Sequence, residues 1–238
     1  IEAARRQMDN LYDNMKIIDG RKMISKNYGM HIDRDEPRKY DVFDVKDSML
    51  YIPEGQAVEG WYNWTTDLRM HECLDLYLWS MDPRDYEKVA EHGWIRFLKE
   101  DNPGYPAEEL RSDLRHIRNR IEDMRKDPTT PDTRLADWPM LFEPTDTRNL
   151  VNLMMGGNLC GGRVWTLHCR VRYFDPERRR AGIPEDVAGL VTKMDEGSTH
   201  LSLVNLNQIE SRTVVLQTGA YGEHQCESVI VGDKEFLV

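Results

Sequence analysis

The residues best suited to chemistry form a short cluster in the segment His71-Glu72-Cys73-Leu74-Asp75. On a helix, positions 71 and 75 lie one turn apart on the same face, so His71 and Asp75 could both ligate a metal ion. Glu72 would then correspond to the general base of H-E-x-x-H enzymes, with Asp75 in place of the second histidine. The alternative interpretation is a helix whose exposed side is simply polar.

Aromatic side chains gather in the same part of the sequence. Tryptophan and tyrosine rings stack on sugar rings because their faces are apolar and polarisable. Glycoside chemistry also needs two carboxylates, one as acid and one as base or nucleophile. The candidate substrate-binding residues are therefore Trp61, Tyr62, Trp64 and Trp79, and the candidate catalytic residues are Asp67, Glu72 and Asp75. The alternative is that these aromatic side chains, with Tyr77 and Trp94, belong to the core.

A third group is the segment from Gly219 to His224, in which two glycines bracket Tyr221. Glycines at these positions favour a bend between strands. Glu223 and His224 would point to opposite faces of an extended segment, so we do not expect them to act as a pair. The sequence contains no G-x-S-x-G nucleophile motif and no phosphate-binding loop.

Charge and hydropathy argue against two classes of partner. The formal net charge is −10, whereas proteins that bind nucleic acids need an excess of Lys and Arg to neutralise phosphates. No apolar run approaches the roughly 18 residues of a membrane helix. The four cysteines, Cys73, Cys160, Cys169 and Cys226, show no C-x-x-C spacing, which disfavours a zinc ribbon. The sequence assigns neither a cofactor nor a compartment.

The elements that position these residues are predicted to be mostly helical up to about residue 160. An amphipathic helix is expected over residues 1–19, ending at Gly20, because apolar residues recur every three or four positions: Ile1, Ala4, Met8, Leu11, Met15 and Ile18. This apolar stripe needs a partner, either an upstream part of the same polypeptide or another protein chain. We interpret the start at Ile1 as a processed chain or the C-terminal part of a longer one.

Residues 20–60 are predicted to be irregular and acidic, and their aspartates do not follow the order of an EF-hand loop. Further helices are expected from Thr65 to Trp79, from Asp82 to Glu100, from Pro106 to Lys126 and from Asp146 to Met155. Asp82-Pro83 has the form of an N-cap followed by proline at the first helical position. The proline-rich loop at 127–145 is long enough to have an interface role.

Strand patterns follow. Residues alternate between apolar and polar from Val164 to Phe174, which is typical of a half-buried strand. Five further strands are predicted at Val187–Met194, Thr199–Leu206, Arg212–Thr218, Gln225–Val231 and Glu235–Val238. Turn residues at 195–197 and 232–233 separate them. This spacing favours an antiparallel β-sandwich or jelly-roll-like module.

The order of these elements resembles the end of bacterial carbohydrate-active enzymes that combine an α/α toroid with a β-sandwich. The segments Leu203–Asn207 and Arg212–Leu216 resemble the final accessory sheet of such enzymes. The resemblance covers about the last eighty residues and concerns architecture, so it transfers no catalytic residue.

We therefore predict an α+β protein, with a mostly helical region at 1–160 and an antiparallel β module at 161–238. Two functions stay open. The chain is the C-terminal portion of a bacterial hydrolase or lyase acting on a carbohydrate-like substrate, or a non-catalytic structural or interaction subunit of a larger complex. Neither a nucleic acid nor a membrane is expected as a partner.

Overall fold

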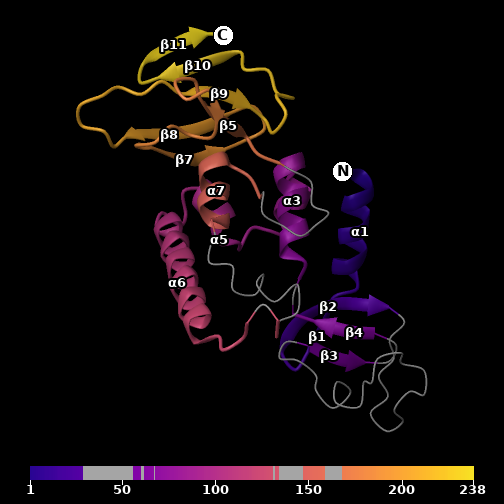
Figure 1. Ribbon diagram of the computed structural model, residues 1–238. Coiled ribbons are helices and arrows are strands. Elements are labelled where there is room, and N and C mark those ends of the chain that lie inside the picture. Colours follow the sequence, from indigo (N-terminus) through magenta and orange to yellow (C-terminus); the bar gives the residue numbers. More distant parts are fainter. Residues whose placement is uncertain (29–55, 60–61, 67, 131, 134–146, 159–167) are drawn as a thin grey trace. The chain divides into compact units, whose positions relative to one another are not determined.

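The computed structural model describes residues 1–238 except 29–55, 60–61, 67, 131, 134–146 and 159–167 (Figure 1). The chain divides into two compact units, Ile1–Tyr77 and Leu78–Val238. Each unit is described by itself below. The fold class is α+β, as predicted, because helices are followed by several small antiparallel sheets.

The first unit contains helix α1 (Glu2–Asp13) and a four-stranded antiparallel sheet. Its strands are β1 (Lys16–Ile18), β2 (Arg21–Tyr28), β3 (Gln56–Glu59) and β4 (Tyr62–Thr65), in the order β1-β2-β4-β3. The buried apolar residues of this unit are Met8, Met23, Ile24, Trp64, Cys73, Leu74, Leu76 and Tyr77.

Two predictions for this unit are wrong. The helix expected over 1–19 ends at Asp13, and Asp19-Gly20 joins β1 to β2, with Ile18 opposite Arg21. Both turn residues have positive φ (50° and 74°), as the favoured two-residue hairpin turn requires, so Gly20 closes a hairpin instead of capping a helix. Residues 21–28 and 56–59 are strands although an irregular segment was expected. The acidic cluster between Asp33 and Asp47 lies outside the described residues.

Helix α3 (Met70–Ser80) crosses the boundary between the units, and the second unit then contains α4 (Pro83–Tyr86), α5 (Gly93–Leu98), α6 (Tyr105–Lys126) and α7 (Arg148–Met155). The predicted cap is confirmed: Asp82 accepts a hydrogen bond from the Arg84 amide at 2.9 Å. The helix expected to run to Glu100 is instead interrupted, and α5 restarts where His92 Nδ1 accepts from the Trp94 amide at 3.2 Å. None of the helices described here has the length and apolar character to cross a membrane.

Among the described residues of the second unit, the strands form three antiparallel sheets. One has the order β6-β5-β9, and the other two are the hairpins β7-β8 and β10-β11. The bounds are β5 Val171–Asp175, β6 Arg180–Ala181, β7 Val187–Met194, β8 Thr199–Asn205, β9 Val215–Thr218, β10 Ser228–Val231 and β11 Lys234–Leu237. The strands predicted after residue 187 are present: β7 has the predicted bounds, β8, β9 and β10 are shorter than predicted, and β11 is shifted by one residue. The sandwich stays a prediction, as does the boundary near residue 160, where 159–167 lie outside the described residues.

The core of the second unit lies where α7 packs on β7. Tyr173 of β5 is 2% exposed, and its hydroxyl donates to the Met154 carbonyl at 2.6 Å. Helix α7 ends at Gly156 with φ 65°, the left-handed conformation that favours glycine. A Cβ at Gly156 would lie 3.0 Å from Val191 Cγ2, so the helix end is in close contact with β7.

Candidate functional site

The polar residues predicted on α3 are present on the helix, but they pair with neighbours along it. His71 Nε2 lies 3.7 Å from Asp75 Oδ2, one turn away as expected. Glu72 Oε1 lies 2.8 Å from Arg69 Nη2. No group of three or more metal-ligating side chains is found among the residues that the structure describes. The metal and catalytic roles of His71, Glu72 and Asp75 stay predictions, and Asp67 lies outside the described residues.

The predicted aromatic residues do not share one environment. Trp64 lies on β4 between β2 and β3, opposite Ser25 and Ala57, and is 4% exposed. The Nζ of Lys16 lies 4.8 Å from its ring centroid. Trp64 therefore belongs to the core of the first unit, which was the alternative considered for it. Tyr62 lies on the same strand, opposite Tyr28 and Glu59, and Trp61 is outside the described residues.

Trp79, in the second unit, is 38% exposed. Its ring lies 4.9 Å from that of His168, at an interplanar angle of 53°. His168 is 3% exposed, and its Nδ1 has no hydrogen-bond partner among the described residues. Burial, followed by the charges of Arg170 and His224, lowers the pKa of His168 to about 4. This histidine is therefore neutral at pH 7 and packs as a core residue.

Cys169, next in the chain, is fully buried. Burial raises the pKa of its thiol to about 11, so the sulfur stays protonated at neutral pH and is a poor nucleophile. The second unit thus offers an imidazole and a thiol side by side in the sequence, and both are held in their neutral forms by the core.

The segment from Gly219 to His224 forms the predicted bend, with positive φ at both glycines (81° and 76°). Glu223 stabilises it, since its carboxylate accepts hydrogen bonds from the amides of Ala220 (3.1 Å) and Tyr221 (2.7 Å). His224 Nε2 lies 4.0 Å from Glu223 Oε1, closer than an extended segment would allow. The carboxylate is occupied by the backbone, which assigns it a structural role.

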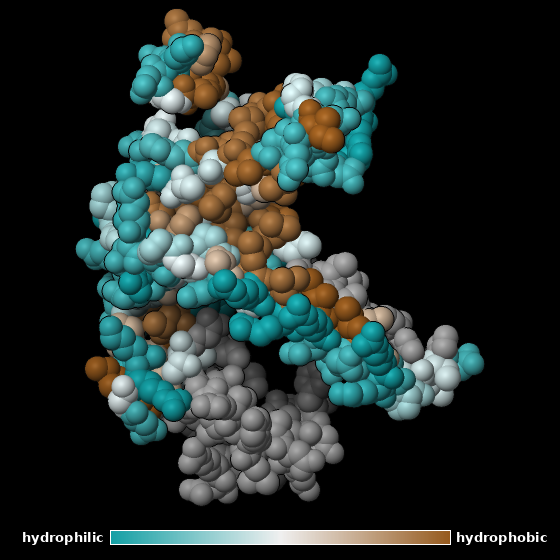
Figure 2. Space-filling view, turned by 90° about the vertical axis from the view of Figure 1, so that its left-hand side faces the viewer, coloured by the Kyte–Doolittle hydropathy of each residue, from teal (hydrophilic) through white to brown (hydrophobic). Residues whose placement is uncertain are grey.

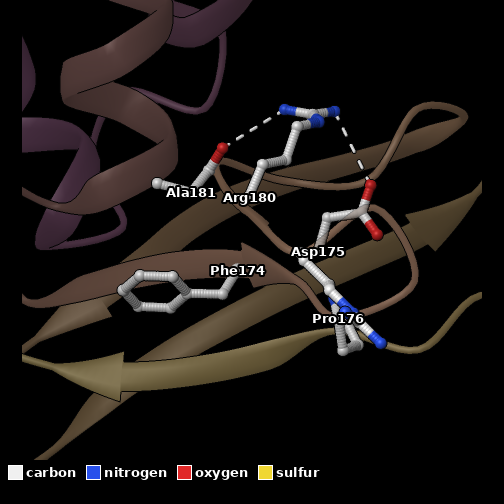
Figure 3. Close-up of a pocket in the computed structure, with 6 residues that line it drawn as sticks. Phe174, Asp175, Pro176, Arg180 and Ala181 are labelled. Carbon is white, nitrogen blue, oxygen red and sulfur yellow. Dashed lines mark hydrogen bonds and ion pairs between the residues drawn. The ribbon is translucent and has the colours of Figure 1, made fainter.

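Two hollows that the sequence did not indicate lie beside the turn between β5 and β6. The first has a volume of about 320 Å³ and is lined by Phe174, Asp175, Pro176, Arg179, Arg180 and Ala181 (Figure 3). The second, of about 210 Å³, is lined by Asp175, Glu177, Arg178, Pro184, Glu185, Glu210 and Arg212. Asp175 borders both, and it is 4% exposed. The lining of the first hollow carries more arginines than carboxylates, whereas the lining of the second hollow carries more carboxylates than arginines.

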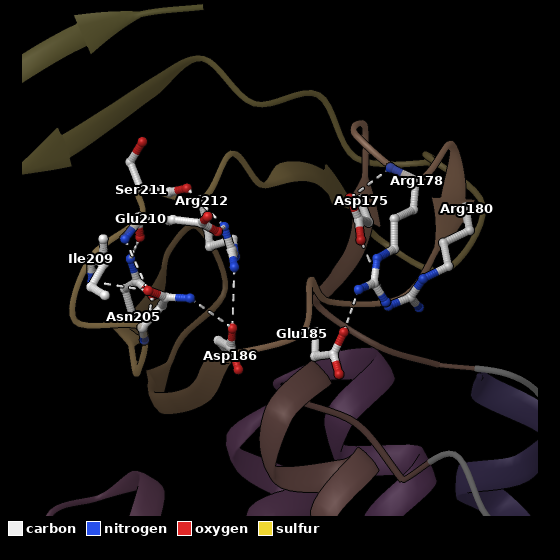
Figure 4. A network of polar contacts seen from close by, with 11 residues as sticks. Asp175, Arg178, Arg180, Glu185, Asp186, Asn205, Ile209, Glu210, Ser211 and Arg212 are labelled. Atoms are coloured by element: carbon white, nitrogen blue, oxygen red, sulfur yellow. Dashed lines mark hydrogen bonds and ion pairs between the residues drawn. The ribbon is translucent and has the colours of Figure 1, made fainter.

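A network of polar contacts surrounds the second hollow (Figure 4). Arg178 donates to Glu185 across the turn. Arg212 donates to Glu210 at 2.7 Å and to Asp186 at 3.2 Å. Hydrogen bonds from Asn207 and Arg212 lower the pKa of Asp186. These guanidinium groups are matched to carboxylates of the chain itself, so the second hollow is held together by internal ion pairs.

The strands at the end of the chain expose apolar side chains. Thirteen of the nineteen exposed large apolar residues reported for the described part of the chain lie after residue 202. We refer to them as the apolar strand region: Leu203, Val204, Leu206, Ile209, Val215, Leu216, Tyr221, Val229, Ile230, Val231, Phe236, Leu237 and Val238. In Figure 2, apolar side chains likewise reach the surface on the face shown.

Both faces of the β10-β11 hairpin contribute to this region. Val229 pairs with Phe236 on one face, and they are 40% and 53% exposed. Ile230 and Leu237 lie on the other face, at 69% and 87%. A soluble hairpin ordinarily keeps one face polar, so the exposure of two apolar faces distinguishes this element from an ordinary surface strand pair.

Comparisons of the chain with protein-family models, with curated proteins and with solved structures gave no match.

Proposed function

We propose that the chain is a non-catalytic structural or interaction subunit of a larger complex, in which another protein chain covers the apolar strand region. The observation that carries this proposal is the β10-β11 hairpin, whose two faces both expose large apolar side chains. Exposed apolar patches of this kind mark sites of protein interaction.

The stability of an isolated hairpin supports the same proposal. Two strands alone are at best marginally stable in water, and they need a third strand or a packed surface. Burying the exposed half of each large apolar side chain contributes roughly 1 kcal/mol. Covering Val229, Ile230, Val231, Phe236 and Leu237 would therefore contribute about 5 kcal/mol toward association.

The strand edges specify the chemistry of that partner. β10 and β11 each pair with one strand in the described part of the chain, so each has a second edge of backbone donors and acceptors. Such an edge accepts a strand from another chain. The hairpin carries one lysine, Lys234, and the acids Asp233 and Glu235 at or beside its turn. We infer a partner that supplies a strand and apolar side chains, with little contribution from charge.

Site-specific photo-crosslinking of the full-length protein in its native cells tests this proposal. A benzophenone amino acid is placed at Phe236, and a matched control is placed at Asn119, which is exposed on α6. The proposal predicts one discrete adduct with a different protein from position 236 and none from position 119. Recovery of uncrosslinked monomer alone from both positions would refute the proposal. An adduct of two identical chains would show instead that the chain covering this region is a second copy of the protein.

A second candidate is the C-terminal portion of a bacterial hydrolase or lyase acting on a carbohydrate-like substrate. The observation that favours it is Trp79, whose exposed surface could stack on a sugar ring. Polysaccharide depletion by the intact protein, compared with Trp79→Ala, separates the two candidates. Depletion that Trp79→Ala abolishes would support the enzyme part, and no depletion by the unchanged protein would argue against it.

A further inference from the structure

The long helix α6 carries a narrow row of apolar side chains. We refer to it as the α6 row: Leu110, Leu114, Ile117, Ile121 and Met124. Its members alternate at steps of four and three residues, which is the heptad spacing of a helix that packs against one other helix along a single seam. At a rise of about 1.5 Å per residue, the row is about 21 Å long.

The α6 row is covered only in part by its own unit. Leu114 and Met124 are 51% and 49% exposed, and the other three members are half-buried. The side of α6 that packs on α7 is centred instead on Asp113, which is 7% exposed and accepts a hydrogen bond from the Asn149 side-chain amide at 2.8 Å. Because Leu114 follows Asp113 by about 100° around the helix, the row lies beside the packed face and extends to the surface.

Three arginines border the row on the side away from Asp113. Arg111, Arg118 and Arg125 are spaced seven residues apart, so they lie in line along the seam. All three are exposed. Arg125 Nη1 lies 2.6 Å from Glu122 Oε1, whereas no ion pair of Arg111 or Arg118 is seen among the described residues. The exposed border of the row is therefore positively charged.

This charge disfavours a second copy of α6 as the partner. In an antiparallel pair of helices, the same borders meet, so the arginines of one copy would face those of the other. In a parallel pair they would face the opposite border, where Asp113 is buried in its own unit and Arg120 carries the same charge. The helix that complements this surface therefore has acidic residues beside its apolar stripe.

From this arrangement we propose that α6 docks an acidic amphipathic helix of a partner protein. The apolar stripe of that helix covers Leu114 and Met124, and its Asp or Glu side chains lie opposite Arg111, Arg118 and Arg125. Opposite charges along the border of a helical seam determine partner choice and orientation. This surface is separate from the apolar strand region and takes a helix instead of a strand, so either proposal can fail without the other.

Three synthetic peptides, each about three heptads long, test this surface on the full chain. The first has leucine along one heptad stripe and glutamate on both borders of it. The second has lysine in place of the glutamates, and the third has the sequence of residues 105–126. In fluorescence anisotropy of labelled peptide, we expect the acidic peptide to bind with a Kd on the order of 100 µM. The other two should bind roughly tenfold more weakly or less.

Variants of α6 then locate the binding. Leu114→Gln should weaken binding of the acidic peptide by about fivefold and Arg118→Gln by about threefold. Arg115→Gln, an exposed arginine that points away from the row, is the matched control and should leave binding unchanged. Equal binding of the acidic and lysine peptides would overturn the proposal, as would equal effects of Arg115→Gln and Arg118→Gln. Equally tight binding of the 105–126 peptide would also overturn it, since the occupant would then be a second copy.

Discussion

The β5-β7 part of the second unit and its β8-β11 part use apolar residues in opposite ways. Val171, Tyr173 and Val191 on β5 and β7 are 6%, 2% and 0% exposed. Ile230 and Leu237 on β10 and β11 are 69% and 87% exposed. The first region completes its core with α7, whereas the apolar residues of the second are left without cover among the described residues. The proposed partner chain would account for this difference by covering the second region.

The largest difference is expected between Tyr173→Ala and Ile230→Ala. Tyr173→Ala removes a buried ring and the hydrogen bond to Met154, which should lower the free energy of unfolding by about 3–5 kcal/mol. Ile230→Ala removes an exposed side chain and should change it by less than about 0.5 kcal/mol. Urea unfolding of the two variants measures both values. Equal losses would show that the hairpin is already part of the core.

The buried His168 should make the free energy of unfolding depend on pH, and this effect is the next largest after that of Tyr173→Ala. The pKa of His168 is about 4 in the folded chain and 6.5 in the unfolded one, so the unfolded chain binds the proton more readily. Its contribution to stability is complete above pH 6.5 and is lost as the pH falls to about 4, a total of about 3 kcal/mol. Burial also lowers the pKa of His92, which adds to the loss at low pH.

His168→Phe keeps an aromatic ring against Trp79 and removes the titrating group. The free energy of unfolding, measured between pH 7 and pH 4, should then fall less steeply, with the contribution of His92 remaining. His200→Gln, at an exposed position on β8, is the matched control and should retain the steep dependence. Identical pH profiles for His168→Phe and the unchanged protein would contradict the assignment.

Two glycines with positive φ provide the smallest and most closely matched comparison. Alanine at either Gly156 (φ 65°) or Gly232 (φ 60°) should cost about 1 kcal/mol of backbone strain. At Gly156 the new Cβ would also crowd Val191 Cγ2 at 3.0 Å, whereas at Gly232 nothing lies within 4 Å. We expect Gly156→Ala to lower the free energy of unfolding by about 2–3 kcal/mol and Gly232→Ala by about 1 kcal/mol. Equal losses of the free energy of unfolding in the two variants would show that α7 can move away from β7 at little cost.

Local patterns predicted the fold where neighbouring residues alone determine it. The alternation of β7, the periodicity of α6 and the Asp82-Pro83 cap were all readable in the sequence. The first hairpin was missed because Met15 and Ile18 also fit a helical period, although Asp19-Gly20 is a hairpin signal. The strands at 21–28 and 56–59 depend on pairing between segments far apart in the sequence, which periodicity does not reveal.

The candidate sites were harder to predict for the same reason. Trp64 lies on β4, between β2 and β3, and is 4% exposed, and nothing in its immediate neighbours shows this. The strands β10 and β11 were predicted from the sequence, but the exposure of their paired apolar side chains follows only from the register.

Hydroxyl-radical footprinting of Phe236 and Tyr173, in the purified chain and in native cells, tests the central claim most directly. In the purified chain, Phe236 should be oxidised readily and Tyr173 protected, in line with exposures of 53% and 2%. In cells, oxidation of Phe236 should fall roughly fivefold or more, as for a side chain at the centre of an interface, while Tyr173 stays protected. Equal oxidation of Phe236 in both settings would contradict the account.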